Sequence, residues 1–192
     1  MSLMKNQGYP KIRLGSNSKT RSLILESNGI KFIQQGGCFN EEQITTIDPL
    51  DFVDIATTGK FDELYRLYGC EDMPLLVADT VVTSDNQLLR KAKDKNDARR
   101  MLELQSNNEV TIITCMIFKS KDTYIKDVSR TTYHFSKFEE KDLEEYINSG
   151  ECMGKAGAIM VEGFCKPYIK SVDGYESTAM GLCVEKLLAY LK

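Results

Sequence analysis

The sequence of 192 residues contains a single histidine, no closely spaced pair of cysteines and no long apolar run. A lone histidine argues against Ser–His–Asp and Cys–His mechanisms, which need an imidazole base beside the nucleophile. His134 alternates with Tyr133 and Phe135, which predicts a surface position on a strand. No apolar run approaches the roughly 20 residues of a membrane span, and the polar N-terminus lacks the apolar core of a secretory signal. We therefore expect a cytoplasmic protein without a membrane partner.

The cysteines and the charge balance exclude further classes. No two cysteines form a Cys-x-x-Cys pair, so we expect neither a zinc site nor a disulfide framework, but reduced and mostly buried thiols. The six positions are Cys38, Cys70, Cys115, Cys152, Cys165 and Cys183. With 25 Lys and Arg against 28 Asp and Glu, the net charge of −3 argues against binding to polymeric nucleic acid by bulk electrostatics.

Strand and helix signals alternate along the chain, which predicts a mixed α/β sheet in one domain or two tightly coupled lobes. Strands are expected at 11–16, 31–35, 75–83, 87–90, 109–119, 123–135, 156–161 and 168–172. Helices are expected at 19–28, 49–68, 94–106, 136–149 and 184–191. Asp48 and Pro49 are typical N-cap and first-turn residues of the second helix, and Ser136-x-x-Glu139 is typical of a capping box.

The segment Gly15-Ser16-Asn17-Ser18-Lys19-Thr20-Arg21 is the first candidate site. It places hydroxyl groups and two cations at the start of a helix, where unpaired N–H groups and the helix dipole favour an anion such as phosphate. The GxxxxGK[ST] pattern of a P-loop is absent. The alternative is an ordinary serine N-cap with surface cations.

Two other segments contain a charged residue in an unusual setting and are further candidate sites. Asp79 interrupts the apolar strand Val77–Val82, where an acid is costly to bury unless it is paired or bound to metal. It is either a metal ligand or general base, or an acid that pairs with a buried cation or faces solvent. Lys155 precedes a run of small residues, where a ligand can approach the backbone or where a strand simply begins tightly.

Taken together, these segments resemble the Maf proteins, a family of nucleoside triphosphate pyrophosphatases. Leu14-Gly15-Ser16-Asn17-Ser18-Lys19-Thr20-Arg21 is similar to L-A-S-x-S-P-R-R, and Ala78–Val82 matches the family's Ala-Asp-Thr-Val-Val strand. Gly154-Lys155-Ala156-Gly157-Ala158-Ile159 resembles Asp-Lys-Ala-Gly-Ala-Tyr, and Asp173-Gly174-Tyr175 with Gly181-Leu182-Cys183 resembles the family's C-terminal pattern. The order and spacing of the motifs agree over nearly the whole chain.

The resemblance implies an elongated mixed sheet flanked by helices, with two lobes and a central cleft, as in the Maf and inosine triphosphate pyrophosphatase folds. It implies a single catalytic domain over 11–192, with 1–10 as an extension or cloning remnant. The implied reaction converts a nucleoside triphosphate to the monophosphate and pyrophosphate with a divalent cation, Mg²⁺ or Mn²⁺. The family is associated with the removal of non-standard nucleotides and, in some bacteria, with septum formation.

The resemblance also implies roles for individual residues. The catalytic set is Asp79, Glu41, Lys60 and Lys91, of which Asp79 and Glu41 would hold the metal. The set that binds the substrate phosphates is Ser16, Ser18, Arg21 and Lys155. The positions that select the base are Thr20, Thr80 and Glu162.

Departures from the family pattern put the choice of substrate in question. Thr20 stands in place of an arginine, Gly154 in place of an acid and Cys183 in place of a proline. Thr80 matches the subgroup associated with dTTP and UTP, whereas Glu162 matches the subgroup associated with 7-methyl-GTP. We expect pyrimidine nucleoside triphosphates to be the preferred substrates.

Two other functions remain open at this point. The chain is either an enzyme or a non-catalytic, nucleotide-binding regulator of septum formation, and an enzyme of this kind could also cleave a different phosphoanhydride. Mere binding requires cations but no base, so the presence of both Glu41 and Asp79 favours the enzyme. The sequence leaves the oligomeric state open, a homodimer included.

Overall fold

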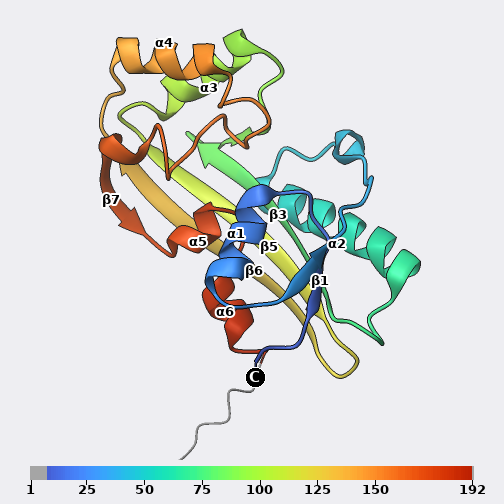
Figure 1. Ribbon diagram of the computed structural model, residues 1–192. Helices are drawn as coiled ribbons and strands as arrows, with labels where there is room; N and C mark the ends of the chain where they lie inside the picture. Colours follow the sequence, from blue (N-terminus) through green and yellow to red (C-terminus); the bar gives the residue numbers. More distant parts are fainter. Residues whose placement is uncertain (1–7, 192) are drawn as a thin grey trace, which may run out of the picture.

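The computed structural model describes residues 8–191 (Figure 1). Of the expected N-terminal extension, residues 1–7 lie outside the described part, and residues 8–10 belong to neither a helix nor a strand. The strands are β1 (Ile12–Leu14), β2 (Phe32–Gln34), β3 (Leu75–Ser84), β4 (Gln87–Leu89), β5 (Glu109–Lys119), β6 (Tyr124–Phe135) and β7 (Ile169–Asp173). The α-helices are α1 (Lys19–Ser27), α2 (Pro49–Tyr68), α3 (Lys95–Gln105), α4 (Glu140–Ser149), α5 (Glu176–Ala179) and α6 (Val184–Leu188), and η1 (Glu41–Gln43) and η2 (Lys166–Tyr168) are 3₁₀ turns.

The strands described form one mixed sheet in the order β2-β1-β3-β5-β6-β7, with β4 paired to β3. β1 runs parallel to β2 and β3, whereas β5 is antiparallel to β3 and β6, and β6 is antiparallel to β7. The long hairpin of β5 and β6 follows from two alternating, β-branched-rich segments joined by a polar turn. The mixed α/β class expected from the sequence is confirmed.

Strand β3 is incompletely paired on one edge, and this opening positions the site. On one side it pairs with β5 over its whole length. On the other side it pairs with β1 at Leu75 and Leu76 and with β4 from Val82 to Ser84. Within residues 8–191, no strand pairs with the intervening stretch 77–81 on that edge. The centre of this stretch, with Asp79 and Thr80, therefore faces a gap between two parts of the molecule.

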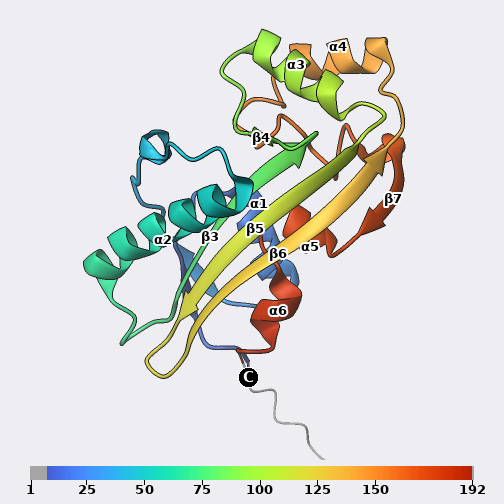
Figure 2. The ribbon, with the colours of Figure 1, turned by 180° about the vertical axis from the view of Figure 1, so that it is seen from behind.

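Helices cover both faces of the sheet (Figures 1 and 2). One face is covered by α2, which packs on β3 and β5. The other face is covered by α1 and α6, whose apolar residues pack on β1, β3 and β5. At the far end of the long strands, α3 and α4 form a further core with β5, β6 and the chain after α4. This gives the two lobes that the resemblance implies.

The expected strand at 156–161 is wrong. The segment consists mainly of turns, and its one isolated bridge pairs Ala156 with Lys91, which follows β4 and belongs to no strand. Gly157 has φ of +61° and Ala158 has φ of +58°, and two successive left-handed residues cannot continue a strand. A Cβ at Gly157 would lie 2.8 Å from Val82, so the turn packs its backbone directly on β3.

Two helix boundaries also differ from expectation. The capping box at Ser136 is not formed, because α4 begins at Glu140 with Glu139 as an N-cap that makes no side-chain hydrogen bond. The Ser136 hydroxyl instead donates to the carbonyl of Tyr168 at 3.2 Å. The C-terminal helix α6 ends at Leu188, three residues earlier than expected.

The expected burial of most cysteines and the expected surface position of His134 on a strand are confirmed. Cys38 is exposed, the other five cysteines are buried, and all six are free thiols. His134 lies exposed on β6, with its Nε2 3.5 Å from a carboxylate oxygen of Glu109. None of the helices formed by residues 8–191 is long and apolar enough to cross a membrane.

Candidate functional site

A cleft of about 640 Å³ lies at the unpaired edge of β3, between the two lobes. Every site residue expected from the sequence lines it: Ser16, Ser18, Thr20, Arg21, Glu41, Lys60, Asp79, Thr80, Lys91, Lys155 and Glu162. These residues come from the turn before α1, α1 itself, η1, α2, β3, the chain after β4 and the turns that follow α4. Segments that are far apart in the sequence therefore converge on one cavity.

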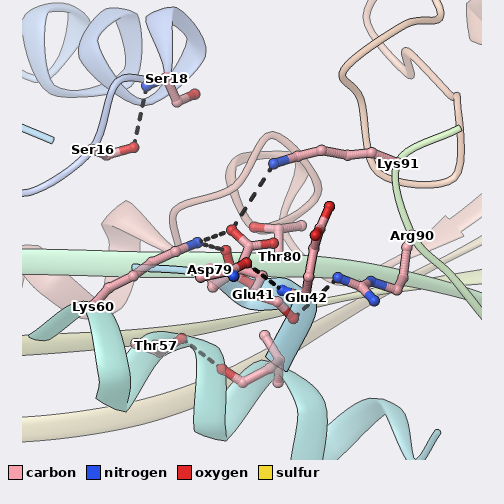
Figure 3. A network of polar contacts seen from close by, with 12 residues as sticks. Ser16, Ser18, Glu41, Glu42, Thr57, Lys60, Asp79, Thr80, Arg90 and Lys91 are labelled. Atoms are coloured by element: carbon pink, nitrogen blue, oxygen red, sulfur yellow. Dashed lines mark hydrogen bonds and ion pairs between the residues drawn. The ribbon is translucent and has the colours of Figure 1, made fainter. Parts of the chain in front are cut away.

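The turn before α1 forms one wall of the cleft. Ser18 is the N-cap of α1, and its hydroxyl oxygen accepts a hydrogen bond from the backbone N–H of Arg21 at 3.3 Å. The Ser16 hydroxyl oxygen accepts from the Ser18 N–H at 3.2 Å (Figure 3) and from Arg21 Nη1 at 3.0 Å. Because both lone pairs of Ser16 Oγ are occupied, its own proton is left to donate to a ligand. The wall thus offers hydroxyl donors at a helix N-terminus, as an anion requires.

The Arg21 guanidinium is fixed by three acceptors from three segments. They are Ser16 Oγ at 3.0 Å, Thr80 Oγ1 at 3.0 Å and the Gly181 carbonyl oxygen at 2.7 Å. Desolvation by burial lowers the pKa of Arg21, and the nearby charges of Asp79 and Glu41 act in the opposite direction. This side chain is a rigid donor that points into the cleft.

Lys60, on α2, lies between two carboxylates (Figure 3). Its Nζ is 2.6 Å from Glu41 Oε1 and also donates a short hydrogen bond to Asp79 Oδ1. The side chain of Asp79 is 9% exposed and that of Lys60 is 19% exposed. Asp79 is therefore the acid paired with a partly buried cation that the sequence left open as an alternative, and it also faces the cleft.

The environment of Glu41 keeps its carboxylate ionised. Desolvation raises its pKa, but the hydrogen bond and charge of Lys60, together with the charges of Lys91 and Arg90, outweigh this and hold the pKa below its ordinary value. Lys91 Nζ lies 4.0 Å from Glu41 Oε1. Because the pKa is depressed in the folded state, this ion pair stabilises the fold above the ordinary pKa of a glutamate and loses that contribution as the pH falls.

Sequence reasoning missed the residues that hold Glu41 in place. Phe39 packs against Gly59 in the middle of α2, where a Cβ would lie 2.2 Å from the Phe39 ring. The N–H of Cys38 donates to both Glu63 carboxylate oxygens at 3.1 Å, and Arg90 Nη2 donates to the Glu41 carbonyl oxygen at 3.2 Å. The glycine directly before Lys60 was a signal in the sequence. A glycine inside a helix costs about 1 kcal/mol of stability relative to alanine, so its presence indicates that another group packs closely against the helix there.

The turns after α4 form the opposite wall. The Gly157 N–H donates to the Arg90 carbonyl oxygen at 3.0 Å, and Gln105 Nε2 donates to the Gly157 carbonyl oxygen at 2.7 Å. These two bonds fix the turn at Gly157, and Lys155 and Glu162, which flank this turn in the sequence, line the cleft. Apolar side chains that the sequence did not indicate also line it: Phe39, Val82, Ile112, Met153, Ile159, Val161 and Met180.

The acidic residues form a pair, not a larger cluster. In the stretch from residue 8 to residue 191, no group of three or more His, Cys, Asp or Glu side chains is placed to hold a metal. Glu41 and Asp79 nevertheless supply the hard oxygen donors that Mg²⁺ takes, since this ion commonly uses one or two carboxylates and completes its shell with water and substrate phosphates. The donor set is therefore compatible with a divalent cation that arrives with a phosphorylated ligand.

The fold and the cleft together define a mixed α/β protein in which a wall of hydroxyl and guanidinium groups faces a pair of carboxylates. Residues 11–192 match the family described as Maf-like protein, and the chain belongs to this family. It is 50% identical to a nucleoside triphosphate pyrophosphatase of a Nitratiruptor species over 183 residues, which cover 94% of this chain and 98% of that protein.

More distant relatives agree with this assignment. A nucleoside triphosphate pyrophosphatase of Helicobacter pylori (strain J99) is 38% identical over 179 residues, covering 93% of this chain and 94% of that protein. One of Campylobacter jejuni subsp. jejuni serotype O:23/36 (strain 81-176) is 33% identical over 180 residues, covering 93% of this chain and 98% of that protein.

Proposed function

We propose that this protein hydrolyses a nucleoside triphosphate to the monophosphate and pyrophosphate. The observation that carries the proposal is the ion-paired set of Glu41, Lys60 and Asp79 facing the hydroxyl and arginine wall across one cleft. The names of the relatives from Nitratiruptor and Helicobacter pylori support the same activity. Cleavage of a phosphoanhydride needs charge neutralisation and a positioned water, and the two sides of the cleft supply these separately.

The cationic wall would bind the triphosphate. Arg21 and Lys155 lie on opposite walls of the cleft, and Ser16 and Ser18 present hydroxyl protons on the same wall as Arg21. Lys91, whose side chain is 61% exposed, can reach a phosphate without leaving a buried partner. In a chain of net charge −3, only this local convergence of cations attracts an anionic substrate.

The carboxylate side would activate water. Asp79 lies on the unpaired edge of β3 in an ion pair with Lys60, and a carboxylate at that position can accept a proton from water in the cleft. Glu41 and Asp79 would hold a divalent cation, Mg²⁺ or Mn²⁺, which would neutralise phosphate charge and lower the pKa of a bound water. The ammonium of Lys60 now lies between the two carboxylates and would have to shift towards the phosphates as they bind.

The rival proposal is a nucleotide-binding regulator of septum formation without catalysis. The two proposals predict different results when the protein is mixed with UTP and Mg²⁺ or Mn²⁺ and pyrophosphate release is followed beside calorimetric binding of a non-hydrolysable UTP analogue. The enzyme releases pyrophosphate in proportion to its concentration. Binding of the analogue without any release from UTP, dTTP, CTP, GTP or 7-methyl-GTP would favour the regulator.

Base selection is assigned here to Thr20, Thr80 and Glu162, with pyrimidine triphosphates as the preferred substrates and non-standard nucleotides within the range. Thr20 lies in the first turn of α1 and is short and neutral, which leaves room in that part of the cleft. Glu162 is exposed at the opposite wall. An ionised carboxylate accepts hydrogen bonds from the N–H groups of a base and repels its carbonyl oxygens.

We expect Glu162→Gln to shift substrate preference towards UTP and dTTP and away from 7-methyl-GTP, by about 10-fold in relative kcat/KM. The amide can donate to the pyrimidine carbonyl oxygens that the carboxylate repels. Steady-state rates on the substrate panel measure the shift, and Glu151→Gln, an exposed acid outside the cleft, is the matched control. Unchanged ratios of kcat/KM would remove Glu162 from base recognition.

We expect Gly59→Ala to lower kcat/KM by about 10- to 100-fold although alanine favours the helix. The new Cβ displaces the Phe39 ring and with it the segment that carries Glu41. Kinetics of Gly59→Ala, Phe39→Ala and the double variant test the cause. If the two changes act through the same contact, the double variant loses no more than the worse single variant. A fully active Gly59→Ala would contradict the account.

A further inference from the structure

We infer that Thr114, a buried residue of β5 outside the cleft, is a positioning residue that sets the hydrogen-bond direction of Thr80 and through it the position of Arg21. Thr114 is buried and does not line the cleft, and it pairs in register with Thr80 on β3. The inference rests on the proposed function where it assigns Arg21 to the substrate phosphates. The chain of hydroxyl groups itself is independent of that assignment.

The direction of the chain follows from the number of protons available. Thr114 Oγ1 lies 2.7 Å from the Thr178 carbonyl oxygen, which can only accept, so Thr114 spends its single hydroxyl proton there. Thr80 Oγ1 lies 2.9 Å from Thr114 Oγ1. Because Thr114 has no second proton, Thr80 must donate in this contact.

Thr80 is consequently an acceptor only towards the cleft. Its proton points to Thr114, and its lone pairs accept from Arg21 Nη2 at 3.0 Å. It cannot donate to a phosphate oxygen or to a base carbonyl without breaking the chain. Any effect of Thr80 on substrate choice therefore passes through the position of Arg21 and not through a hydrogen bond donated to the substrate.

The same chain holds the third acceptor of Arg21. The Thr178 carbonyl oxygen that accepts from Thr114 also accepts from the Gly181 N–H at 3.0 Å. The Gly181 carbonyl oxygen in turn accepts from Arg21 Nε. Gly181 has φ of +104°, and a Cβ there would lie 3.3 Å from Arg21 Nε. The absence of a side chain at Gly181 therefore lets the guanidinium pack directly on the backbone.

The geometry leaves a fork of two donors for the ligand. A guanidinium has five N–H groups, of which Gly181, Ser16 and Thr80 take one each from Nε, Nη1 and Nη2. One N–H on each terminal nitrogen is left without an acceptor among residues 8–191. These two N–H groups can donate to two oxygens of one phosphate, and their aim is lost if the guanidinium rotates.

The test compares Thr114→Val, Thr114→Ser and Thr131→Val. Valine keeps the shape of threonine but removes the hydroxyl, and serine keeps the hydroxyl. Thr131 is the matched control, because it is equally buried and its hydroxyl donates to the Tyr175 carbonyl oxygen at 2.6 Å, anchoring the same segment without touching Thr80. Two measurements are made on each full-length protein: the ¹H–¹⁵N signal of Arg21 Nε without ligand, and calorimetric binding of inorganic tripolyphosphate.

We expect Thr114→Val to accelerate solvent exchange of the Arg21 Nε proton and to weaken tripolyphosphate binding by about 10-fold, the scale of one hydrogen bond to a charged group. Thr114→Ser and Thr131→Val should remain within about twofold of the wild type. If Thr114→Val does not fold, Thr114→Ala also removes the hydroxyl group and should give the same Arg21 signature.

Three results would overturn the inference. They are an unchanged Arg21 signal in Thr114→Val, an equal loss in Thr131→Val, and failure of serine to restore the wild-type signal. The proposed function fails separately, if the wild-type protein shows these signals but cleaves no nucleoside triphosphate. If the wild type binds no tripolyphosphate, the phosphate assignment of Arg21 is overturned, and the exchange rate of Arg21 Nε still decides whether Thr114 positions it.

Discussion

Asp79→Asn is expected to lower kcat by about 10²- to 10⁴-fold, the range typical for the loss of a general base, while the protein remains folded. The amide is nearly isosteric with the carboxylate, but it accepts no proton near neutral pH and is a poorer metal ligand. Asp79 is the buried acid at the unpaired edge of β3, and it faces both Lys60 and the cleft. The variant keeps a polar group beside Lys60, which in turn keeps its contact with Glu41 at 2.6 Å.

A matched control separates the catalytic role from a structural one. Asp127 on β6 is a half-buried acid that is likewise paired with a lysine, since its Oδ1 lies 2.7 Å from Lys186 Nζ, but it does not line the cleft. Asp127→Asn should leave kcat unchanged. Thermal unfolding of both variants shows whether the fold is intact. Activity of Asp79→Asn within a few-fold of the wild type would remove this residue from the mechanism.

Lys60→Ala is expected to give the second large loss, about 10²-fold or more in kcat/KM, since it removes the charge that lies between Glu41 and Asp79. The two carboxylates then lack their shared partner, and no cation on α2 faces the phosphates. Lys91→Ala should cost less, about 10-fold, because its ammonium lies 4.0 Å from Glu41 and its side chain is mostly exposed.

The lysine variants need a control for general loss of positive charge. Lys126 on β6 forms an ion pair with Asp54 on α2, and neither residue lines the cleft. Lys126→Ala should retain wild-type kinetics. Chemical denaturation gives the free energy of unfolding of each variant, and the expected loss of activity exceeds what any change in folded fraction explains. Normal hydrolysis by both Lys60→Ala and Lys91→Ala would show that the cationic side of the cleft is misassigned.

Much of the fold could be predicted because its signals are local. Asp48 caps α2 by accepting from the N–H groups of Leu50 and Asp51 at 2.9 Å, as its position before Pro49 predicts. The alternating residues of β5 and β6 predict the long hairpin. The segment 156–161 was misassigned because its small residues are compatible with a strand, and only its packing on Val82 shows why Gly157 and its neighbour form a turn.

The gap in β3 could not be predicted in the same way. It exists because β1 and β4 pair with opposite ends of one strand, and strand pairing between distant segments leaves no periodic signal in either of them. The sequence therefore identified Asp79 as an unusual acid without showing that it lies at an open edge.

The members of the site were predicted from a family resemblance, whereas their geometry was not. All of the residues expected to act on substrate line one cleft. Three contacts of the site join segments at least 19 residues apart in the sequence. They are the placement of Lys60 between two acids, the packing of Phe39 on Gly59 and the hydrogen bonds that link Thr114 to Arg21. Such contacts depend on tertiary packing, which composition and spacing do not encode.

The central claim is that the cleft breaks the bond between the α- and β-phosphates of a nucleoside triphosphate. Phosphorus-31 NMR of a reaction with UTP and Mg²⁺, run beside Asp79→Asn, tests it directly. We expect equal amounts of UMP and pyrophosphate from the wild type, with neither UDP nor orthophosphate as an early product, and almost no turnover by the variant. Formation of UDP and orthophosphate, or equal product formation by Asp79→Asn, would contradict it.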